Sequence, residues 1–228
     1  LLIDADFAPG PVVSVPATRQ AIQKARRAGI GWAVIRNTLH QGAMGYYALM
    51  AAQEGMAGLA IVCNPPNMAP FGARVAGVHN SPIAICVPRK KRRPLMLDMA
   101  TSVAAQGKLD VAKDKGISIP LGWALDRSGK PTTDPHAAAV LLPAGGGKGS
   151  GLAMLFECLT SLFAGNPLLA PVFQGRPGAD VHHQNSVIAA VDIASFTDVD
   201  QYRADVDDIV SGIKALPPAD GFTEVLVP

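Results

Sequence analysis

The segment from residue 31 to residue 63 constrains the fold most strongly, because two short apolar runs flank a helix-like stretch. The runs Gly31–Ile35 and Leu59–Cys63 are uninterrupted, which is typical of buried strands. Between them, Ala43–Glu54 is rich in small and helix-forming residues and is followed by a glycine. A strand, a loop, a helix and a second strand within about 30 residues predict a βαβ crossover.

The rest of the chain continues this alternation and predicts an α/β fold with a single domain over residues 1–228. Further helices are expected at 16–28, 102–115, 152–163 and 198–215. Further strands are expected at 83–87, 95–99, 186–193 and 224–227. The stretch 64–81 is dense in proline, glycine and asparagine and predicts a long loop, and 122–126 with 128–135 predicts a turn-rich connection.

Composition excludes several classes of protein. Apolar residues make up 49% of the chain and charged residues 17%, which excludes an intrinsically disordered chain. The net charge is only +2, and aromatic residues make up 5%, so no nucleic-acid partner is expected. The basic run Arg89–Arg93 could be a nucleic-acid patch, but prolines and two apolar strands flank it, which favours a solvated hairpin loop.

The sequence also points to a cytoplasmic protein. No apolar run reaches the ~18 residues of a membrane span, and no secretory signal is visible. Cys63, Cys86 and Cys158 are far apart and odd in number, which predicts buried, reduced thiols rather than disulfides. The chain begins without methionine and ends on a strand-like run, as expected of the middle of a longer polypeptide.

His40 is the leading candidate for a catalytic residue. It follows the first buried strand, and ligands of open α/β sheets bind at the carboxyl ends of strands. The following Gln41, Gly42 and Ala43 begin a helix, whose backbone N–H groups favour an anionic group such as a phosphate. Histidine can move a proton near neutral pH. The alternative is a solvated histidine or one that caps the helix.

Two more segments have the residue types of a binding site. Gly145–Gly151 surrounds Lys148 and precedes an apolar helix, so it could cradle a phosphate or carboxylate, although it matches neither a Walker A loop nor GxGxxG. Its alternative is a flexible turn. Asp98 ends a strand and could accept hydrogen bonds from a ribose or an amide, or cap the next helix. The pair at 182–183 lacks a HExxH pattern or spaced carboxylates, so no metal site is predicted there.

Several strings resemble the malate/L-lactate dehydrogenase type 2 family, which includes ureidoglycolate and sulfolactate dehydrogenases and Δ1-piperideine-2-carboxylate reductases. They occur in the family order over nearly the whole chain. The strings are His40-Gln-Gly-Ala-Met-Gly-Tyr-Tyr47, Asn64-Pro-Pro-Asn-Met-Ala-Pro-Phe-Gly72, Asn80-Ser-Pro-Ile-Ala-Ile85, Leu97-Asp-Met-Ala-Thr-Ser102, Ile119-Pro-Leu-Gly-Trp-Ala-Leu-Asp126, Pro131-Thr-Thr-Asp-Pro135, Gly147-Lys-Gly149 and Gly151-Leu-Ala153.

The resemblance implies an NAD(P)-dependent homodimeric oxidoreductase that acts on a small 2-hydroxy or 2-keto acid. It implies a mixed sheet with flanking helices, a sulfolactate-dehydrogenase-like NAD(P)-binding fold that is not a Rossmann fold. The residue at the position of His40 looks like the general acid/base, and Asn80 matches a position near the substrate. Positions that match cofactor contacts are His40, Gln41, Gly42, Ala43, Met44, Asn64, Asp98, Met99, Ala100, Lys148 and Gly149.

The resemblance also leaves alternatives open. In some imine and ketone reductases of the family, the string at His40 is assigned to cofactor binding, and the proton donor is a histidine in an N-terminal Ser-His-Gly motif. This chain does not contain that segment, nor the C-terminal segment that contacts cofactor in the family. The alternatives are therefore an NADPH-dependent reductase of a cyclic imine (Δ1-piperideine-2-carboxylate or Δ1-pyrroline-2-carboxylate) and a non-catalytic fragment that at most binds nucleotide.

Overall fold

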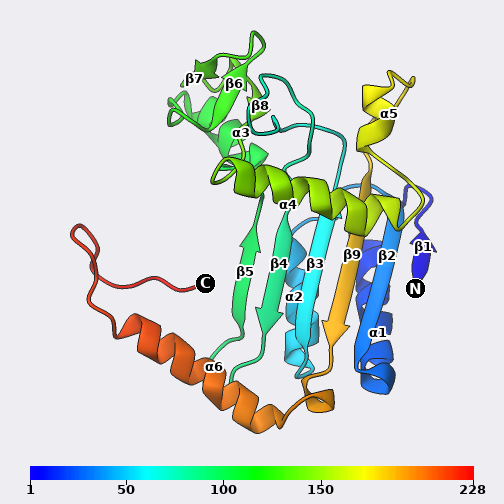
Figure 1. The fold of residues 1–228 in the computed structure, drawn as a ribbon, viewed down its shortest axis with the longest axis vertical. Coiled ribbons are helices and arrows are strands. Elements are labelled where there is room, and N and C mark those ends of the chain that lie inside the picture. Colours follow the sequence, from blue (N-terminus) through cyan, green and yellow to red (C-terminus); the bar gives the residue numbers. More distant parts are fainter.

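The computed structural model describes all residues from 1 to 228 and is built around a six-stranded mixed sheet of order β1-β2-β9-β3-β4-β5 (Figure 1). The strands of this sheet are β1 Leu2–Asp4, β2 Ile30–Thr38, β3 Ala57–Cys63, β4 Ile83–Val87, β5 Leu95–Met99 and β9 Gln184–Val191. The helices are α1 Gly10–Ala28, α2 Met44–Gln53, α3 Gln106–Lys115, α4 Gly147–Glu157, α5 Leu169–Phe173 and α6 Val199–Lys214. A π-helical turn, Cys158–Leu162, extends α4, and a 3₁₀ turn, Ile193–Ser195, precedes α6.

The mixed sheet confirms the predicted fold class and changes the expected crossover. The strands β2 and β3 run in the same direction with α2 between them in sequence, but β9 is inserted between them and pairs antiparallel with both. The hairpin of β4 and β5 continues the sheet beyond β3. As a result β2, β3 and β5 all end at one edge of the sheet, where β4 and β9 begin; we call this the upper edge (Figure 1).

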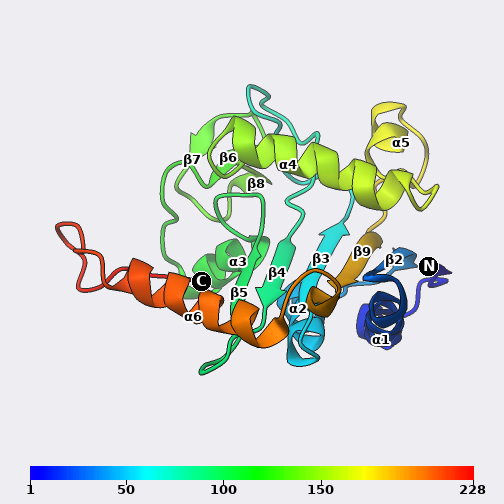
Figure 2. The same ribbon diagram turned by 60° about the horizontal axis from the view of Figure 1, so that its bottom comes forward.

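Helices cover the two faces of the sheet unequally. The helices α1 and α2 pack on one face over β2, β9, β3 and β4, where the main apolar core lies (Figure 1). On the opposite face, α4 and its π-helical turn cross the sheet near the upper edge, with Phe156 packed against Ile61. The helix α6 runs along the other end of the sheet, away from α4 (Figure 2). No helix is both long enough and apolar enough to cross a membrane.

Several expected boundaries are wrong, for identifiable reasons. The first helix begins at Gly10 rather than Pro16, because Pro16 lies inside a helix that already starts with Pro11 in its first turn. The expected strand 224–227 has no pairing partner and remains irregular. The turn-rich connection instead forms a small second sheet of β6 Ala124–Asp126, β7 Pro131–Thr132 and β8 Ala138–Leu141.

Two further expectations are corrected. The helix predicted to begin at 152 already begins at Gly147, so the glycine-rich stretch supplies its first turn rather than a preceding loop. Cys158 is exposed, whereas Cys63 and Cys86 are buried as expected. Cys158 begins the π-helical turn that extends α4, whereas the other two thiols lie on strands in the core.

An ion pair fixes the basic hairpin to α6. The Arg89 Nε atom donates a hydrogen bond of 2.7 Å to Asp207 Oδ1, and the backbone N–H of Lys91 donates one of 2.9 Å to Oδ2. The Asp207 side chain is only 9% exposed. The hairpin forms as predicted, but one of its arginines is engaged in packing rather than solvated. Burial raises the pKa of Asp207, and its bonds to Arg89 and Lys91 outweigh this and hold it below the ordinary 3.8.

We expect Asp207→Asn to lower the Tm at neutral pH, because the amide keeps the shape but not the charge of the carboxylate. A carboxyl whose folded pKa is depressed stabilises the fold above its ordinary pKa, and this contribution is lost as the pH falls through the folded value. The Tm difference between variant and wild type should therefore shrink below about pH 4. Asp208→Asn, at an exposed neighbouring position, is the matched control, and an equal Tm loss there would contradict the assignment.

Candidate active site

A polar cleft of about 550 Å³ opens at the upper edge of the sheet. Its walls come from segments that leave or enter the sheet at this edge, together with the start of α3. The lining residues are His40, Gly42, Val62, Asn64, Pro65, Pro66, Asn67, Asn80, Pro82, Ala105, Gln106, Gly107, Asp180, His182 and Gln184. Four of the predicted site residues, His40, Gly42, Asn64 and Asn80, therefore share one cleft. Its volume lies within the range of about 300–1,000 Å³ of small-molecule sites.

Gln41, a buried residue between His40 and Gly42, holds the turn between β2 and α2 in place. The Gln41 Nε2 atom donates to Thr38 Oγ1 at 2.7 Å, and its Oε1 accepts from Ser14 Oγ at 3.1 Å. The backbone N–H of Gln41 donates to Gln184 Oε1 at 2.8 Å. With its side chain 1% exposed, Gln41 orients the turn from behind rather than facing the cleft. Its neighbours on either side, His40 and Gly42, line the cleft.

The start of α2 borders the cleft. Gly42 has a φ of +77°, which suits glycine, and no atom lies within 4 Å of where a Cβ would stand. Ala43 is the N-cap residue and makes no side-chain cap; in the first turn, the N–H of Tyr46 donates to the Ala43 carbonyl at 3.2 Å and that of Gly45 donates to Asp98. The side chain of Met44 is buried in the main core, so only its backbone can contact a ligand.

Asn67 and Asn80 form a reciprocal pair on the cleft wall. The Asn67 Nδ2 atom donates to Asn80 Oδ1 at 3.0 Å, and the backbone N–H of Asn80 donates to Asn67 Oδ1 at 2.8 Å. Asn64, at the end of β3, donates only to the neighbouring Pro65 carbonyl at 3.0 Å. The cleft therefore presents amide groups that can both donate and accept hydrogen bonds.

The predicted residues at the end of β5 lie outside the cleft but contact the start of α2. The Asp98 Oδ2 atom accepts a hydrogen bond of 2.7 Å from the backbone N–H of Gly45, in the first turn of α2. Asp98 therefore caps a helix, as one reading of the sequence proposed, although the helix is α2 rather than the next one in sequence. Met99 and Ala100 follow it and are partly exposed.

Lys148 and Gly149 lie in the first turn of α4, further along the same edge. The Lys148 side chain is exposed. A Cβ on Gly149 would lie 2.3 Å from the backbone oxygen of Thr101, which also accepts the N–H of Ala144 at 2.8 Å. These contacts bring the start of α4 against the residues that directly follow β5. The predicted cofactor residues therefore form a continuous path from the cleft, over the start of α2 and the end of β5, to the start of α4.

Among the cleft residues that sequence reasoning did not assign to the site are Asp180, His182 and Gln184. They precede or begin β9, about 140 positions after His40, and no local motif marked them. Burial lowers the pKa of His182 from its ordinary 6.5, and the nearby His40 and His183 lower it further. Two imidazoles thus lie in one cleft, and the surroundings of His182 favour its neutral form.

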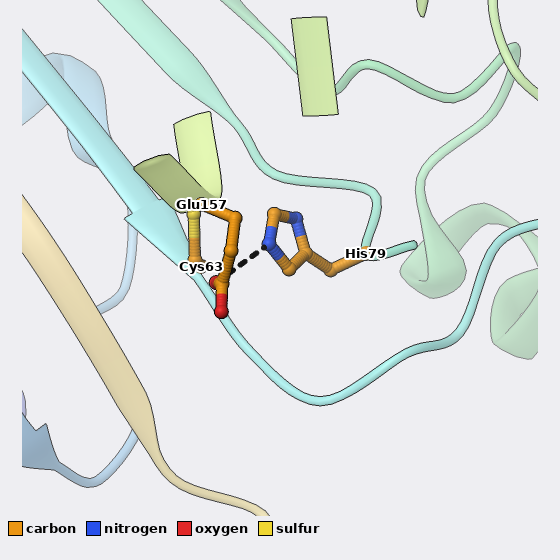
Figure 3. Close-up of side chains that lie close together, drawn as sticks. All are labelled: Cys63, His79 and Glu157. Atoms are coloured by element: carbon orange, nitrogen blue, oxygen red, sulfur yellow. Dashed lines mark hydrogen bonds and ion pairs between the residues drawn. The ribbon is translucent and has the colours of Figure 1, made fainter. Parts of the chain in front are cut away.

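Directly beneath the cleft, Cys63, His79 and Glu157 form a buried cluster (Figure 3). The thiol comes from the end of β3, the imidazole from the segment before β4 and the carboxylate from the end of α4. The His79 Nε2 and Glu157 Oε2 atoms are 3.4 Å apart. The other Glu157 oxygen accepts backbone N–H bonds from Leu168 at 2.6 Å and Leu169 at 3.1 Å.

Charge balance in this cluster favours an ionised carboxylate. Burial alone raises the pKa of Glu157, but the bonds from His79, Ser161 and the two backbone N–H groups together lower it. Burial alone lowers the pKa of His79, and the neighbouring Cys63 and Glu157 outweigh it and raise the pKa to about 9. By contrast, Cys86 lies in apolar surroundings, where burial raises the pKa of its thiol to about 11.

Comparison with known proteins identifies the family of this chain. The family model of malate/L-lactate dehydrogenase matches residues 1–228. L-sulfolactate dehydrogenase of Methanocaldococcus jannaschii is 37% identical over 230 residues, covering 100% of this chain and 66% of that enzyme. Ureidoglycolate dehydrogenase (NAD(+)) of Escherichia coli K12 is 31% identical over 234 residues, covering 100% of this chain and 65% of that enzyme.

A solved structure of a third relative has the same fold. The crystal structure of Δ1-piperideine-2-carboxylate reductase from Pseudomonas syringae pv. tomato superposes with a TM-score of 0.82 and 29% identity. The match covers 92% of this chain and 64% of that one. The chain thus spans slightly less than two thirds of the length of these relatives.

Proposed function

The chain belongs to the malate/L-lactate dehydrogenase family, and from this premise we propose that it acts in an NAD(P)-dependent oxidoreductase. The proposed reaction moves a hydride between the nicotinamide ring and C2 of a small 2-hydroxy or 2-keto acid. The observation that carries the proposal is the continuous path of predicted cofactor residues that leads out of the cleft containing His40. Relatives named as sulfolactate and ureidoglycolate dehydrogenases support the substrate class.

The residues along the path fit a dinucleotide. The open space at Gly42 lets a ligand approach the backbone closely, and the positive end of the α2 dipole favours a phosphate beside it. The exposed ammonium of Lys148 supplies a positive charge at the far end of the path. The remaining contacts that we propose for the cofactor are made by His40, Gln41, Ala43, Met44, Asn64, Asp98, Met99, Ala100 and Gly149. Of these, Gln41 and Met44 act through their backbones, because their side chains are buried.

In this mechanism, His40 is the general acid/base. Its exposed imidazole lines the cleft, where it takes the proton of the substrate hydroxyl during oxidation and returns it to the carbonyl oxygen during reduction. The amide groups of Asn64 and Asn80 orient the substrate and the reacting end of the cofactor. A bound nicotinamide supplies the hydride chemistry, while the protein supplies position and charge.

Assembly and location belong to the proposal as well. We propose a homodimer in the cytoplasm, as the family resemblance implies. The outward side of α4 supports an interface, since Leu152, Met154 and Leu155 are 40%, 55% and 60% exposed. Light scattering on the purified protein would measure the mass, and a monomer at micromolar concentration would refute the dimer.

The function is tested by titration with NADH and NADPH, following nicotinamide fluorescence and the Tm. We expect saturable binding of one of them, which also identifies the cofactor. Lys148→Met should raise its Kd about tenfold, because a charge-assisted contact of about 1.5 kcal/mol is lost. Lys24→Met, an exposed lysine on α1, should leave the Kd unchanged. A chain that binds neither dinucleotide, with a Tm insensitive to both, would support the non-catalytic alternative.

The second candidate function, reduction of a cyclic imine, is favoured by the structural match to the piperideine-2-carboxylate reductase. It uses the same cofactor path and differs in the bond that is reduced. A panel that compares 2-keto acids with cyclic imines at one cofactor concentration distinguishes the two. A kcat/KM at least tenfold higher for the imine would replace the hydroxy-acid assignment.

A further inference from the structure

We propose that Cys63, His79 and Glu157 bind a single zinc ion in a buried structural site beneath the cleft. The inference rests on the cluster itself and does not depend on the proposed oxidoreductase function. One potential ligand atom from each residue, the thiol sulfur, an imidazole nitrogen and a carboxylate oxygen, lies within 4.8 Å of the other two. Figure 3 shows the three side chains converging from different elements, with a ring nitrogen of His79 directed at the other two.

The chemistry of the three ligand atoms selects the metal. Thiolate sulfur, imidazole nitrogen and carboxylate oxygen are the ligands that Zn²⁺ uses in proteins, whereas Ca²⁺ and Mg²⁺ prefer oxygen alone. Bonds of about 2.0–2.3 Å in a tetrahedron separate neighbouring ligand atoms by about 3.3–3.6 Å. The 3.4 Å between His79 Nε2 and Glu157 Oε2 already matches this separation. The sulfur lies within 4.8 Å of the other two atoms and would move closer to them on binding, and a water molecule would take the fourth position.

The atoms that would not bind the metal are already held in place. The Glu157 Oε1 atom accepts the two backbone N–H bonds at the start of α5, which leaves Oε2 for the ion. The His79 Nδ1 atom is hydrogen-bonded to Ser81 Oγ, which leaves Nε2 for the ion. Metal-ligating histidines commonly use their second ring nitrogen in this way, and the partner fixes the ring orientation.

Burial and charge also favour a cation at this point. Cys63 and His79 are 0% exposed and Glu157 is 5% exposed. Burying a carboxylate is costly unless an opposite charge or a metal compensates it. Zinc binding would release the ring proton of His79 and the thiol proton of Cys63, so that the ion balances the carboxylate and the thiolate and the whole site carries no net charge.

The site would act on the cleft through the chain neighbours of its ligands. Asn64 directly follows Cys63, and Asn80 directly follows His79; both line the cleft. The metal would thus join the end of β3, the segment before β4 and the end of α4 immediately behind two proposed ligand-binding residues. Because the ligands are buried, the ion is structural and does not contact the substrate.

The test is metal analysis of protein produced with supplemental zinc, followed by removal of zinc and titration with Co²⁺. We expect about one zinc per chain and, with Co²⁺, a thiolate-to-cobalt charge-transfer band in the near ultraviolet that saturates at one equivalent. Cys63→Ser should lose the band and most of the zinc. Cys158→Ser is the matched control, because this exposed thiol is outside the cluster and its loss should change neither readout.

Two results would overturn the proposal. Wild-type protein that folds without bound zinc and gives no charge-transfer band with Co²⁺ would identify the cluster as a metal-free hydrogen-bonded network. Zinc that is retained in full by Cys63→Ser would place the metal elsewhere. If Cys63→Ser does not fold, the wild-type Co²⁺ spectrum still decides, because it reports directly on a sulfur ligand.

Discussion

Replacing His40 with alanine is expected to lower kcat by about 100-fold or more, because a positioned general acid/base contributes roughly 10²–10⁴ to the rate. The imidazole lines the cleft and is exposed, so its removal leaves the apolar core untouched and the Tm near that of the wild type. The KM should change by less than about threefold, because the lost interaction belongs mainly to the transition state. Steady-state kinetics with the substrate and cofactor selected by the titrations would measure both constants.

The matched control is His136→Ala, an exposed histidine between β7 and β8 that does not line the cleft. It should leave kcat unchanged. If His40→Ala keeps a near-wild-type kcat, proton transfer belongs to another group, and the proposed role of His40 is refuted. His182 would then be tested next, because it lies in the same cleft and its lowered pKa favours the neutral form that can accept a proton.

The location of the site was predictable because ligands bind at the carboxyl ends of strands, and this rule holds here although the sheet is mixed. The sequence predicts that His40, Asn64 and Asp98 each lie at the carboxyl end of a strand. These three strands are separated in the sheet by antiparallel neighbours, yet β2, β3 and β5 point the same way. Their carboxyl ends therefore share one edge, and the residues that follow them come together without any local motif that links them.

The cleft residues next to β9 could not be predicted, because their position depends on which distant strand is inserted between β2 and β3. Strand β9 enters between β2 and β3 through pairing with residues more than 120 positions away, and this brings His182 opposite His40. Similarly, in the sequence Glu157 is a polar residue within the apolar helix expected at 152–163. Only the packing of α4 against β3 places it beside Cys63 and His79. Periodicity reports the local element and not its partner.

Two glycines determine how closely the helices approach the sheet, and we expect alanine at either one to destabilise the fold by about 3 kcal/mol. A Cβ on Gly31 in β2 would lie 1.8 Å from the backbone oxygen of Ala21 in α1. A Cβ on Gly58 in β3 would lie 2.1 Å from the backbone oxygen of Ala48 in α2. Because both obstacles are backbone atoms, no side-chain rotation relieves the contact and the helix itself must move.

The measurement is denaturant unfolding of Gly31→Ala and Gly58→Ala beside Gly212→Ala. Gly212 lies within α6 with no atom near the position of a Cβ, so alanine there should stabilise the protein by about 0.5–1 kcal/mol. For a chain of this size, the two strand variants should lose roughly 6–12 °C in Tm. Gly58→Ala carries a second consequence, because moving α2 displaces its first turn, where Gly45 donates a hydrogen bond to Asp98, and with it the neighbouring cleft residue Gly42. It should therefore weaken dinucleotide binding as well as stability, whereas Gly31→Ala should act mainly on stability. Stability within about 1 kcal/mol of wild type for both variants would show that the helix-to-sheet spacing is not fixed at these glycines.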